Sequence, residues 1–404
     1  MSFPFVPFGS LYTEPVRNGL TRPTAVRGNG YRMVNMGELF AYDRIAEQEM
    51  DRVQLNEREL QVATLEPGDL LFARSSLKVE GTGKCSFVQS LPEVTTFESH
   101  LIRARLDRRK VDPRFYFYFF QSYYGRATVL SIAKQVGAAG LPGSKLAGLS
   151  VPCPAQTIQS RIADILTAYD DMIENNRRRM ALLEDAARQL YREWFVRLRF
   201  PGHEHTRTNE GVPEGWKRLP VPEAIAINPR TPLSDDDEHW WVEMADLPTN
   251  SMVIQSAVKR SGRSGSKFRN GDTLFARITP CLENGKTSFV NFMEENEAGR
   301  GSTEFIVLRS MRLTPEFVYC MARTYNFREH AIKSMIGASG RQRVQESCFE
   351  KFFILEPSMS LLVQFSEAAE PVFEQIKVLH TQNQKLRAAR DLLLPRLMSG
   401  EIAV

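Results

Sequence analysis

An internal repeat constrains the fold of this chain more than any other feature of its sequence. The segment GDLLFAR begins at Gly68 and returns as GDTLFAR at Gly271, about half of the 404-residue chain later. Three further pairs recur at nearly the same offset: GKCSFV with GKTSFV, VGAAG with IGASG, and LSVPCP with FFILEP. Because one offset relates several motifs, we interpret the chain as a duplication and expect its halves to fold alike.

Each half ends in a long amphipathic segment. Between Thr157 and Arg199, apolar residues recur at alternating spacings of three and four, and neither Gly nor Pro interrupts them. The segment from Ser360 onward repeats the pattern, but Pro371 and Pro395 should bend or end it. This periodicity predicts two long helices with a coiled-coil-like seam. Some 40 helical residues would form a rod on the order of 60 Å long, so each helix needs a partner.

We expect these two helices to pack on each other in antiparallel orientation. Asn176 and Asn383 interrupt the two apolar stripes, as polar residues that fix helix register do in coiled coils. A helical hairpin with no role beyond packing remains the simpler alternative.

The rest of each half has the pattern of an α+β domain. Short apolar segments such as LFAR, CSFV, TSFV and TEFIVLRS predict strands. Asp112-Pro113 and Thr314-Pro315 predict an N-cap followed by proline in the first turn of a helix rich in aromatic residues. The polar segment 201–216 reads as an exposed linker.

The predicted fold class is therefore α+β, with two repeated domains separated by two long antiparallel helices about a pseudo-two-fold axis. The predicted boundaries are domain 1 at 1–155, a central helix at 156–200, a linker and domain 2 at 201–357, and a C-terminal helix at 358–404.

Composition narrows the class of protein. The net charge of +4 permits nucleic-acid binding without requiring it. The five cysteines show neither disulfide nor zinc spacing. No secretory signal or membrane-spanning apolar run is apparent, so we expect a protein of the reducing cytoplasm with no membrane partner.

Catalytic motifs are missing from the sequence. NGKTS at Asn284 resembles the end of a phosphate-binding loop, but Pro280 stands where the first glycine is required. No lysine follows an acidic residue at the two-residue spacing of restriction-type nucleases, and Asn228-Pro229-Arg230 is not an amino-methyltransferase motif. We therefore expect neither catalytic residues nor a bound metal or cofactor in this chain.

The basic segments of the chain favour DNA binding over catalysis. A flexible loop of domain 2, the arginine that ends each GD-x-LFAR segment, and the Gly-rich loops near residues 137–145 and 337–343 carry cations and hydrogen-bonding side chains. The candidate DNA-binding residues are Arg74, Lys78, Lys84, Ser144, Lys145, Arg260, Arg263, Lys267, Arg269, Arg277, Lys286, Ser339, Arg341, Gln342 and Arg343.

For each of these residues a solvated loop position or a structural ion pair remains an alternative to a DNA contact. The aromatic run FYFYFF at Phe115–Phe120 lies at helical spacing, so we assign it to the core and not to base stacking.

The sequence resembles the specificity subunit of type I restriction–modification systems over nearly its whole length. The most specific segments are REWF (Arg192–Phe195), PEGW (Pro213–Trp216), the repeated GD-x-LFAR, and LLLPRLMSGEI (Leu392–Ile402). The resemblance implies two target-recognition domains, each reading one half of a bipartite asymmetric site in double-stranded DNA. It also implies that the chain is not an enzyme itself.

The resemblance further implies that the helices set the spacer and dock two methyltransferase (modification) subunits. The candidate docking residues are Ile162, Tyr169, Ile173, Met180, Leu183, Trp194, Ile376, Leu379, Leu386 and Leu393. The complex would use S-adenosylmethionine, ATP and Mg through other subunits, which include restriction/translocase subunits. Two alternatives stay open: the recognition subunit of another nuclease–methylase system, and a helical scaffold that does not bind DNA.

Overall fold

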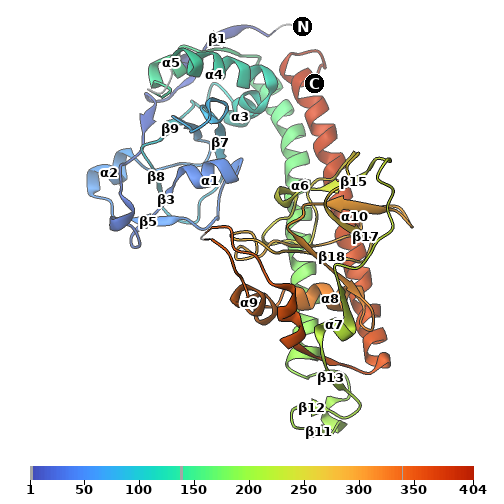
Figure 1. Cartoon of the computed structure of the whole chain (residues 1–404). Helices are drawn as coiled ribbons and strands as arrows, with labels where there is room; N and C mark the ends of the chain where they lie inside the picture. Colours follow the sequence, from blue (N-terminus) through green and yellow to red (C-terminus); the bar gives the residue numbers. More distant parts are fainter. Residues whose placement is uncertain (1–2, 137–139, 339) are drawn as a thin grey trace. The chain divides into compact units, whose positions relative to one another are not determined.

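The computed structural model describes residues 3–136, 140–338 and 340–404, with the side chains of 134–136 left out. The chain divides into two compact units (Figure 1). Unit 1 comprises residues 1–172 and 385–404, and unit 2 comprises residues 173–384. Each long helix contributes to both units, so this division does not test the domain boundaries expected from the sequence.

Unit 1 is built around the strand that contains LLFA. This strand, β6, is buried along its whole length at the centre of a five-stranded sheet in the order β2-β9-β6-β7-β4. A second sheet has the order β5-β3-β8, and β1 pairs with β10. The strands are β1 Phe5–Pro7, β2 Arg17–Asn18, β3 Tyr31–Val34, β4 Arg44–Ile45, β5 Asp51–Val53, β6 Leu70–Ala73, β7 Cys85–Val88, β8 Thr95–Phe97, β9 Leu101–Ala104 and β10 Ser150–Pro152.

Helices cover these sheets. The helices of unit 1 other than the long ones are α1 Met36–Ala41, α2 Glu57–Val62, α3 Pro113–Gln121, α4 Tyr123–Val136 and α5 Gly143–Ala147. As predicted, the Asp112 side chain caps α3 by accepting a hydrogen bond from the Arg114 backbone N–H. All six aromatic residues at Phe115–Phe120 are buried, which confirms their assignment to the core.

Unit 2 repeats the central arrangement. Its TLFA strand, β18, lies inside a sheet of order β14-β21-β18-β19, beside a second sheet of order β16-β15-β20-β17. The strands are β11 Thr208–Asn209, β12 Val212–Pro213, β13 Lys217–Pro220, β14 Ile225–Ile227, β15 His239–Val242, β16 Val258–Arg260, β17 Ser266–Arg269, β18 Thr273–Ala276, β19 Thr287–Phe289, β20 Ala298–Gly301, β21 Phe305–Ser310 and β22 Phe353–Glu356. The short helices are α7 Val221–Ala224, α8 Pro315–Ala322 and α9 Tyr325–Lys333.

The strand registers of the two units correspond. In unit 1, Leu71 of β6 pairs with Arg103 of β9 and with Ser86 of β7. In unit 2, Leu274 of β18 pairs with Val307 of β21 and with Ser288 of β19. Both sets of pairs are antiparallel, so the halves fold alike, as the repeat predicted.

The long helices are α6, Gln156–Tyr191, which continues as a π-helical turn to Val196, and α10, Met359–Met398. In unit 1, Ile162 of α6 shares a core with Leu397 of α10. In unit 2, Tyr191 of α6 contacts Phe365 of α10, with ring centroids 6.3 Å apart. Figure 1 shows the two helices running side by side.

The helix pair is antiparallel, as predicted. Within unit 2, Asn176 faces Asn383 whereas the later Tyr191 faces the earlier Phe365. Of the two effects expected of Pro371 and Pro395, bending or ending the second helix, the ending does not occur, because α10 runs through both residues. Both prolines are exposed, so water can satisfy the carbonyl groups that their missing N–H groups leave unpaired.

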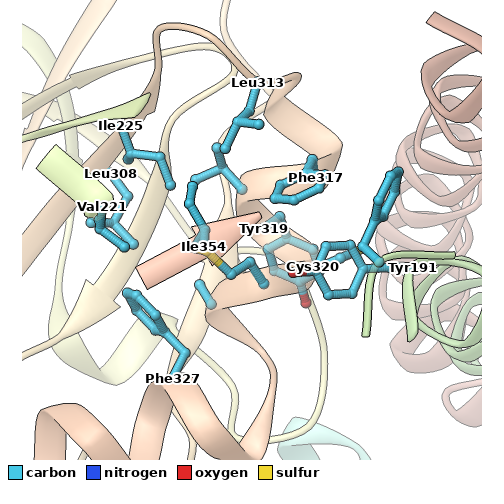
Figure 2. Packing of buried hydrophobic residues seen from close by; sticks show 14 of the residues in the cluster. Tyr191, Val221, Ile225, Leu308, Leu313, Phe317, Tyr319, Cys320, Phe327 and Ile354 are labelled. Carbon is cyan, nitrogen blue, oxygen red and sulfur yellow. The ribbon is translucent and has the colours of Figure 1, made fainter. Parts of the chain in front are cut away.

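The core of unit 2 joins its sheet to the helix pair. Tyr191 of α6 packs edge-on against Phe317 of α8, with ring centroids 4.9 Å apart (Figure 2). Leu308 of β21 and Ile354 of β22 belong to the same buried cluster. The α+β part of unit 2 is therefore fixed to the helices by a continuous apolar core.

Candidate nucleic-acid interface

The repeated aspartate of GD-x-LFAR stabilises the fold in both units. Asp69 receives two hydrogen bonds from Arg105, at 2.8 and 2.9 Å, and Asp272 receives two from Arg309, both at 2.7 Å. Each carboxylate also accepts a backbone N–H three residues earlier, at 2.8 Å. Both aspartates are buried. This part of the motif is therefore an internal ion pair and is not available to a ligand.

The repeated lysines of the GK segments also have internal partners. The Lys84 ammonium donates to the carbonyl oxygen of Phe40 at 2.7 Å and lies 3.5 Å from Asp43. The Lys286 ammonium donates to the carbonyl oxygen of Met244 at 2.7 Å. Both lysines hold the central sheet against an earlier segment of the same unit. Their candidacy as DNA contacts stays a prediction that competes with these bonds.

In unit 1, the end of β6 lies against the segment before α5. The Leu141 backbone N–H donates to the Arg74 carbonyl at 2.7 Å, and a Cβ at Gly140 would lie 3.1 Å from the same oxygen. Lys78 follows β6 on an exposed stretch. Ser144 and Lys145 are exposed on α5. The structure thus brings Arg74 beside the loop that the sequence singled out.

Unit 2 has the same juxtaposition at the end of β18. The Val344 N–H donates to the Arg277 carbonyl at 2.8 Å, and Thr279 exchanges two 3.0 Å hydrogen bonds with the Gln342 backbone. Arg341 is exposed and makes no side-chain hydrogen bond or ion pair within the described residues. Ser339, also a candidate, lies outside the described residues.

Two arginines at this end of unit 2 have acidic partners. The Arg277 guanidinium lies 3.1 Å from Glu346 and 3.3 Å from the Val344 carbonyl oxygen. Arg343 lies 2.6 Å from Glu304, which raises its pKa through hydrogen bonding. Of the two alternatives open for Arg277, the structure shows the ion pair.

The remaining candidates lie on β16, β17 and the loop between them. The Arg260 guanidinium stacks on the Trp241 ring, with its carbon 3.8 Å from the ring centre. It also forms an ion pair with the Glu243 carboxylate at 2.8 Å. Arg263 lies 3.6 Å from Asp236. Lys267 and Arg269 have no ion-pair partner within the described part of the chain. This group is a basic surface that nearby acids partly neutralise.

Arg300, which the sequence did not single out, anchors this surface. Its guanidinium is fully buried and donates to the carbonyl oxygens of Arg263, at 3.1 Å, and Ser234, at 3.0 Å. It also pairs with Asp235 and lowers the pKa of that carboxyl through their hydrogen bond. In the sequence, the flanking Gly299 and Gly301 indicate only that this strand is tightly packed. A Cβ at Gly299 would lie 2.5 Å from the Phe268 side chain, and one at Gly301 would lie 2.7 Å from the Phe305 side chain.

All ten candidate docking residues are at least partly buried, and six of them lie in or against the apolar cores of the two units. Ile162, Ile173, Ile376 and Leu379 are buried, and the other six, Tyr169, Met180, Leu183, Trp194, Leu386 and Leu393, are partly buried. The exposed apolar residues of α6 and α10 are different ones, which the sequence analysis missed: Met172, Leu182, Met359, Val363, Val378 and Leu392.

The described residues contain no cluster of three or more His, Cys, Asp or Glu side chains that could hold a metal ion. Within the same residues, no helix has both the length and the apolar character needed to cross a membrane.

Comparisons with known proteins extend this picture. Residues 61–185 match the model of the type I restriction modification DNA specificity domain. The MjaIX type I restriction enzyme specificity subunit of Methanocaldococcus jannaschii is 24% identical over 284 residues, covering 65% of this chain and 63% of that protein. The resemblance to type I specificity subunits is confirmed.

A second relative, the EcoKI type I specificity subunit of Escherichia coli K12, is 29% identical over 172 residues, covering 41% of this chain and 36% of that protein. The matches thus span less than two thirds of these type I specificity subunits. The crystal structure of the type I S subunit from M. genitalium shares 13% identity, with a TM-score of 0.56 over 98% of this chain and 96% of that one. This likeness confirms the predicted fold class.

Proposed function

We propose that this chain is the sequence-specific DNA-binding subunit of a type I restriction–modification complex, and that each unit reads one half of a bipartite asymmetric site. One observation carries the proposal. The two units share the buried Asp69–Arg105 and Asp272–Arg309 pairs, but beside the end of the central strand unit 1 exposes Ser144 and Lys145 whereas unit 2 exposes Arg341. Two different half-sites require such a difference, because sequence is read through side-chain contacts to base edges.

The internal bonds of the cations separate the candidate DNA contacts into two groups. Lys84, Lys286, Arg277 and Arg343 already have internal partners, so their contribution to DNA affinity should be small. Lys78, Lys145, Lys267, Arg269 and Arg341 are the candidates that we assign to phosphate or base contacts. Arg341 is the leading candidate in unit 2, since its flexible guanidinium is exposed beside Gln342.

We assign the chemistry to other subunits. The chain would act as a non-catalytic subunit in the cytoplasm. Two modification subunits would supply S-adenosylmethionine and methylate adenine, and restriction subunits would supply the ATP- and Mg-dependent steps. The exposed apolar residues of α6 and α10, such as Leu182 and Leu392, are better docking candidates than the ten residues chosen from the sequence.

Methylome sequencing tests this proposal. A host without DNA methylation would carry the chain with its neighbouring methyltransferase, or the methyltransferase alone. We expect methylated adenines at a split asymmetric motif only when the chain is present. If the two proteins are soluble and associated but no motif appears, the proposal fails and a helical scaffold explains the fold better. Methylation without a split motif would favour another nuclease–methylase system.

A further inference from the structure

A buried carboxylate of α6 joins the α+β part of unit 2 to the helix pair. Glu184 is only 3% exposed. It accepts hydrogen bonds from the Tyr319 hydroxyl at 2.6 Å and from the Met252 backbone N–H at 2.7 Å, and it lies 3.8 Å from Arg323. Tyr319 belongs to α8 (Figure 2), whereas Met252 lies between β15 and β16. One side chain of the helix thus holds two separate segments of the domain.

In unit 1, another carboxylate of α6 joins the α+β part of the unit to the helix pair. Asp170 accepts hydrogen bonds from the Tyr118 hydroxyl at 2.8 Å, from Arg44 at 3.1 Å, and from Arg390 of α10 at 2.5 Å. Tyr118 lies on α3 and Arg44 on β4. Asp170 therefore joins both long helices to two elements of the α+β part of unit 1.

The tyrosines remain donors in both groups. Burial, and then the charge of the neighbouring carboxylate, raises the pKa of Tyr118 and of Tyr319. Each hydroxyl therefore stays protonated at neutral pH and points its hydrogen at the carboxylate. These contacts differ from the apolar core around them, because hydrogen bonds are directional whereas apolar contacts tolerate small rotations.

We propose that Glu184 and Asp170 are positioning residues that fix the orientation of each recognition domain on the helix pair, and thereby the spacer length that the complex accepts. The inference rests on the proposed function. Glu184 is buried and Asp170 is mostly buried, and a carboxylate in such a place that accepts from several segments favours one orientation of those segments, since a rotation leaves its charge with fewer donors. Each reading surface would then keep one orientation on the helix segments of its own unit.

The test uses the complete complex and a DNA library in which the half-sites are constant and the spacer varies. Glu184→Gln offers one acceptor where two donors arrive, and Tyr319→Phe removes one donor. We expect the preference for the native spacer over spacers one base pair longer or shorter to fall about tenfold. Both half-site sequences should stay unchanged. Asp170→Asn should have the same kind of effect through unit 1.

Asp185→Asn is the matched control, because Asp185 is the exposed neighbour of Glu184 and contacts only Gln189 of its own helix among the described residues. It should keep the native spacer preference. Hydrogen exchange at the Met252 amide, which Glu184 protects, shows directly whether each variant has lost the contact while the rest of unit 2 remains folded.

The outcomes separate the two proposals. If the wild-type complex reads no split site, the proposed function fails. If the wild type reads one spacer and the folded Glu184→Gln, Tyr319→Phe and Asp170→Asn variants all keep the same preference, the positioning role is overturned. A change in half-site sequence without a change in spacer preference would also overturn it.

Discussion

The two units share their buried ion pairs but differ at the end of the central sheet. Asp69–Arg105 and Asp272–Arg309 have the same geometry, and Lys84 and Lys286 both donate to an earlier backbone carbonyl. At the strand end, however, Arg277 has an acidic partner whereas Arg74 has none within the described residues. Within a duplicated chain, features that both copies retain identify the scaffold, and features that differ identify candidate readers of sequence.

A second difference lies where α3 and α8 begin. In unit 1, Asp112 caps α3 and bonds to Arg114 and Ser160. In unit 2, Thr314 caps α8, and Glu316 bonds to Ser366. The capping role is retained with different side chains, so the two units should respond differently to mutation and to pH.

The largest expected effect comes from breaking the shared ion pair. Asp272→Ala leaves the Arg309 guanidinium mostly buried without its partner, so we expect it to destabilise unit 2 by about 3–5 kcal/mol. Asp69→Ala should destabilise unit 1 less, because Arg105 keeps Glu66 at 2.6 Å and Glu14 at 3.1 Å. All four tryptophans lie in unit 2, so their fluorescence in urea reports on that unit alone.

Hydrogen exchange would measure the stability of unit 1, and the exposed Asp237→Ala would serve as the control. Equal losses in the two units would contradict the view that Arg105 has alternative partners.

A smaller effect should come from the cations that differ between the units. Arg341→Ala should weaken binding by about 1–3 kcal/mol and relax selectivity in one half-site only. Lys78→Ala should weaken binding through the other half-site. If it removes a phosphate contact, the slope of the logarithm of the binding constant against the logarithm of the salt concentration should fall in magnitude by about 1. Competition binding of the complex to libraries randomised in one half-site at a time measures both. Arg178→Ala, on the exposed face of α6, should change neither half-site. If either variant changed selectivity in both half-sites, the assignment of one half-site to each unit would be wrong.

The buried asparagine pair joins the long helices of the two repeats, because Asn176 lies on α6 and Asn383 on α10. Asn176 donates to Asn383 at 3.0 Å, and Asn383 donates to the Ile173 carbonyl at 3.2 Å. Asn383→Leu alone should cost about 1–3 kcal/mol, because it leaves the Asn176 amide buried without its partner. The double variant with Asn176→Leu should recover most of that loss but widen the range of helix registers. Urea unfolding measures the first effect, and spin-label distances between α6 and α10 measure the second.

The smallest effect should appear in the pH dependence of the carboxylates at the start of α3 and α8, Asp112 and Glu316. Burial tends to raise the pKa of Asp112, but hydrogen bonds from Arg114 outweigh it and lower the pKa below its ordinary 3.8. Its contribution to stability is therefore present above that value and is lost as the pH falls through the folded-state pKa. Asp112→Asn should flatten the acid-side loss of stability in unit 1.

Glu316 should behave in the opposite way, because burial raises its pKa above the ordinary 4.5. Its contribution is present below 4.5 and is lost as the pH rises through the folded-state pKa. Glu316→Gln should remove that loss from unit 2. Hydrogen exchange from pH 3 to 7 resolves the two units, and the same pH response in both would contradict the assignment.

Local pattern was enough to predict the repeat, the long helices, the caps at Asp112 and Thr314, and the buried aromatic run. It was not enough to predict which cations have internal partners. Arg277 meets Glu346, 69 residues later, and Arg300 meets Asp235, 65 residues earlier. Periodicity predicted the amphipathic character of α6, but it could not show which of its apolar residues face α10 and which, such as Met172 and Leu182, stay exposed.

The proposed function predicts that the length of the helix pair sets the spacer between the two half-sites. This prediction can be tested by inserting four residues, one turn of about 6 Å, directly after Asn176 in α6 and directly before Asn383 in α10, so that Asn176 still meets Asn383 and the antiparallel seam stays matched. Methylome sequencing of this variant with the methyltransferase should give the same two half-sites with a spacer longer by about two base pairs. An unchanged spacer in a folded, active complex would contradict the account.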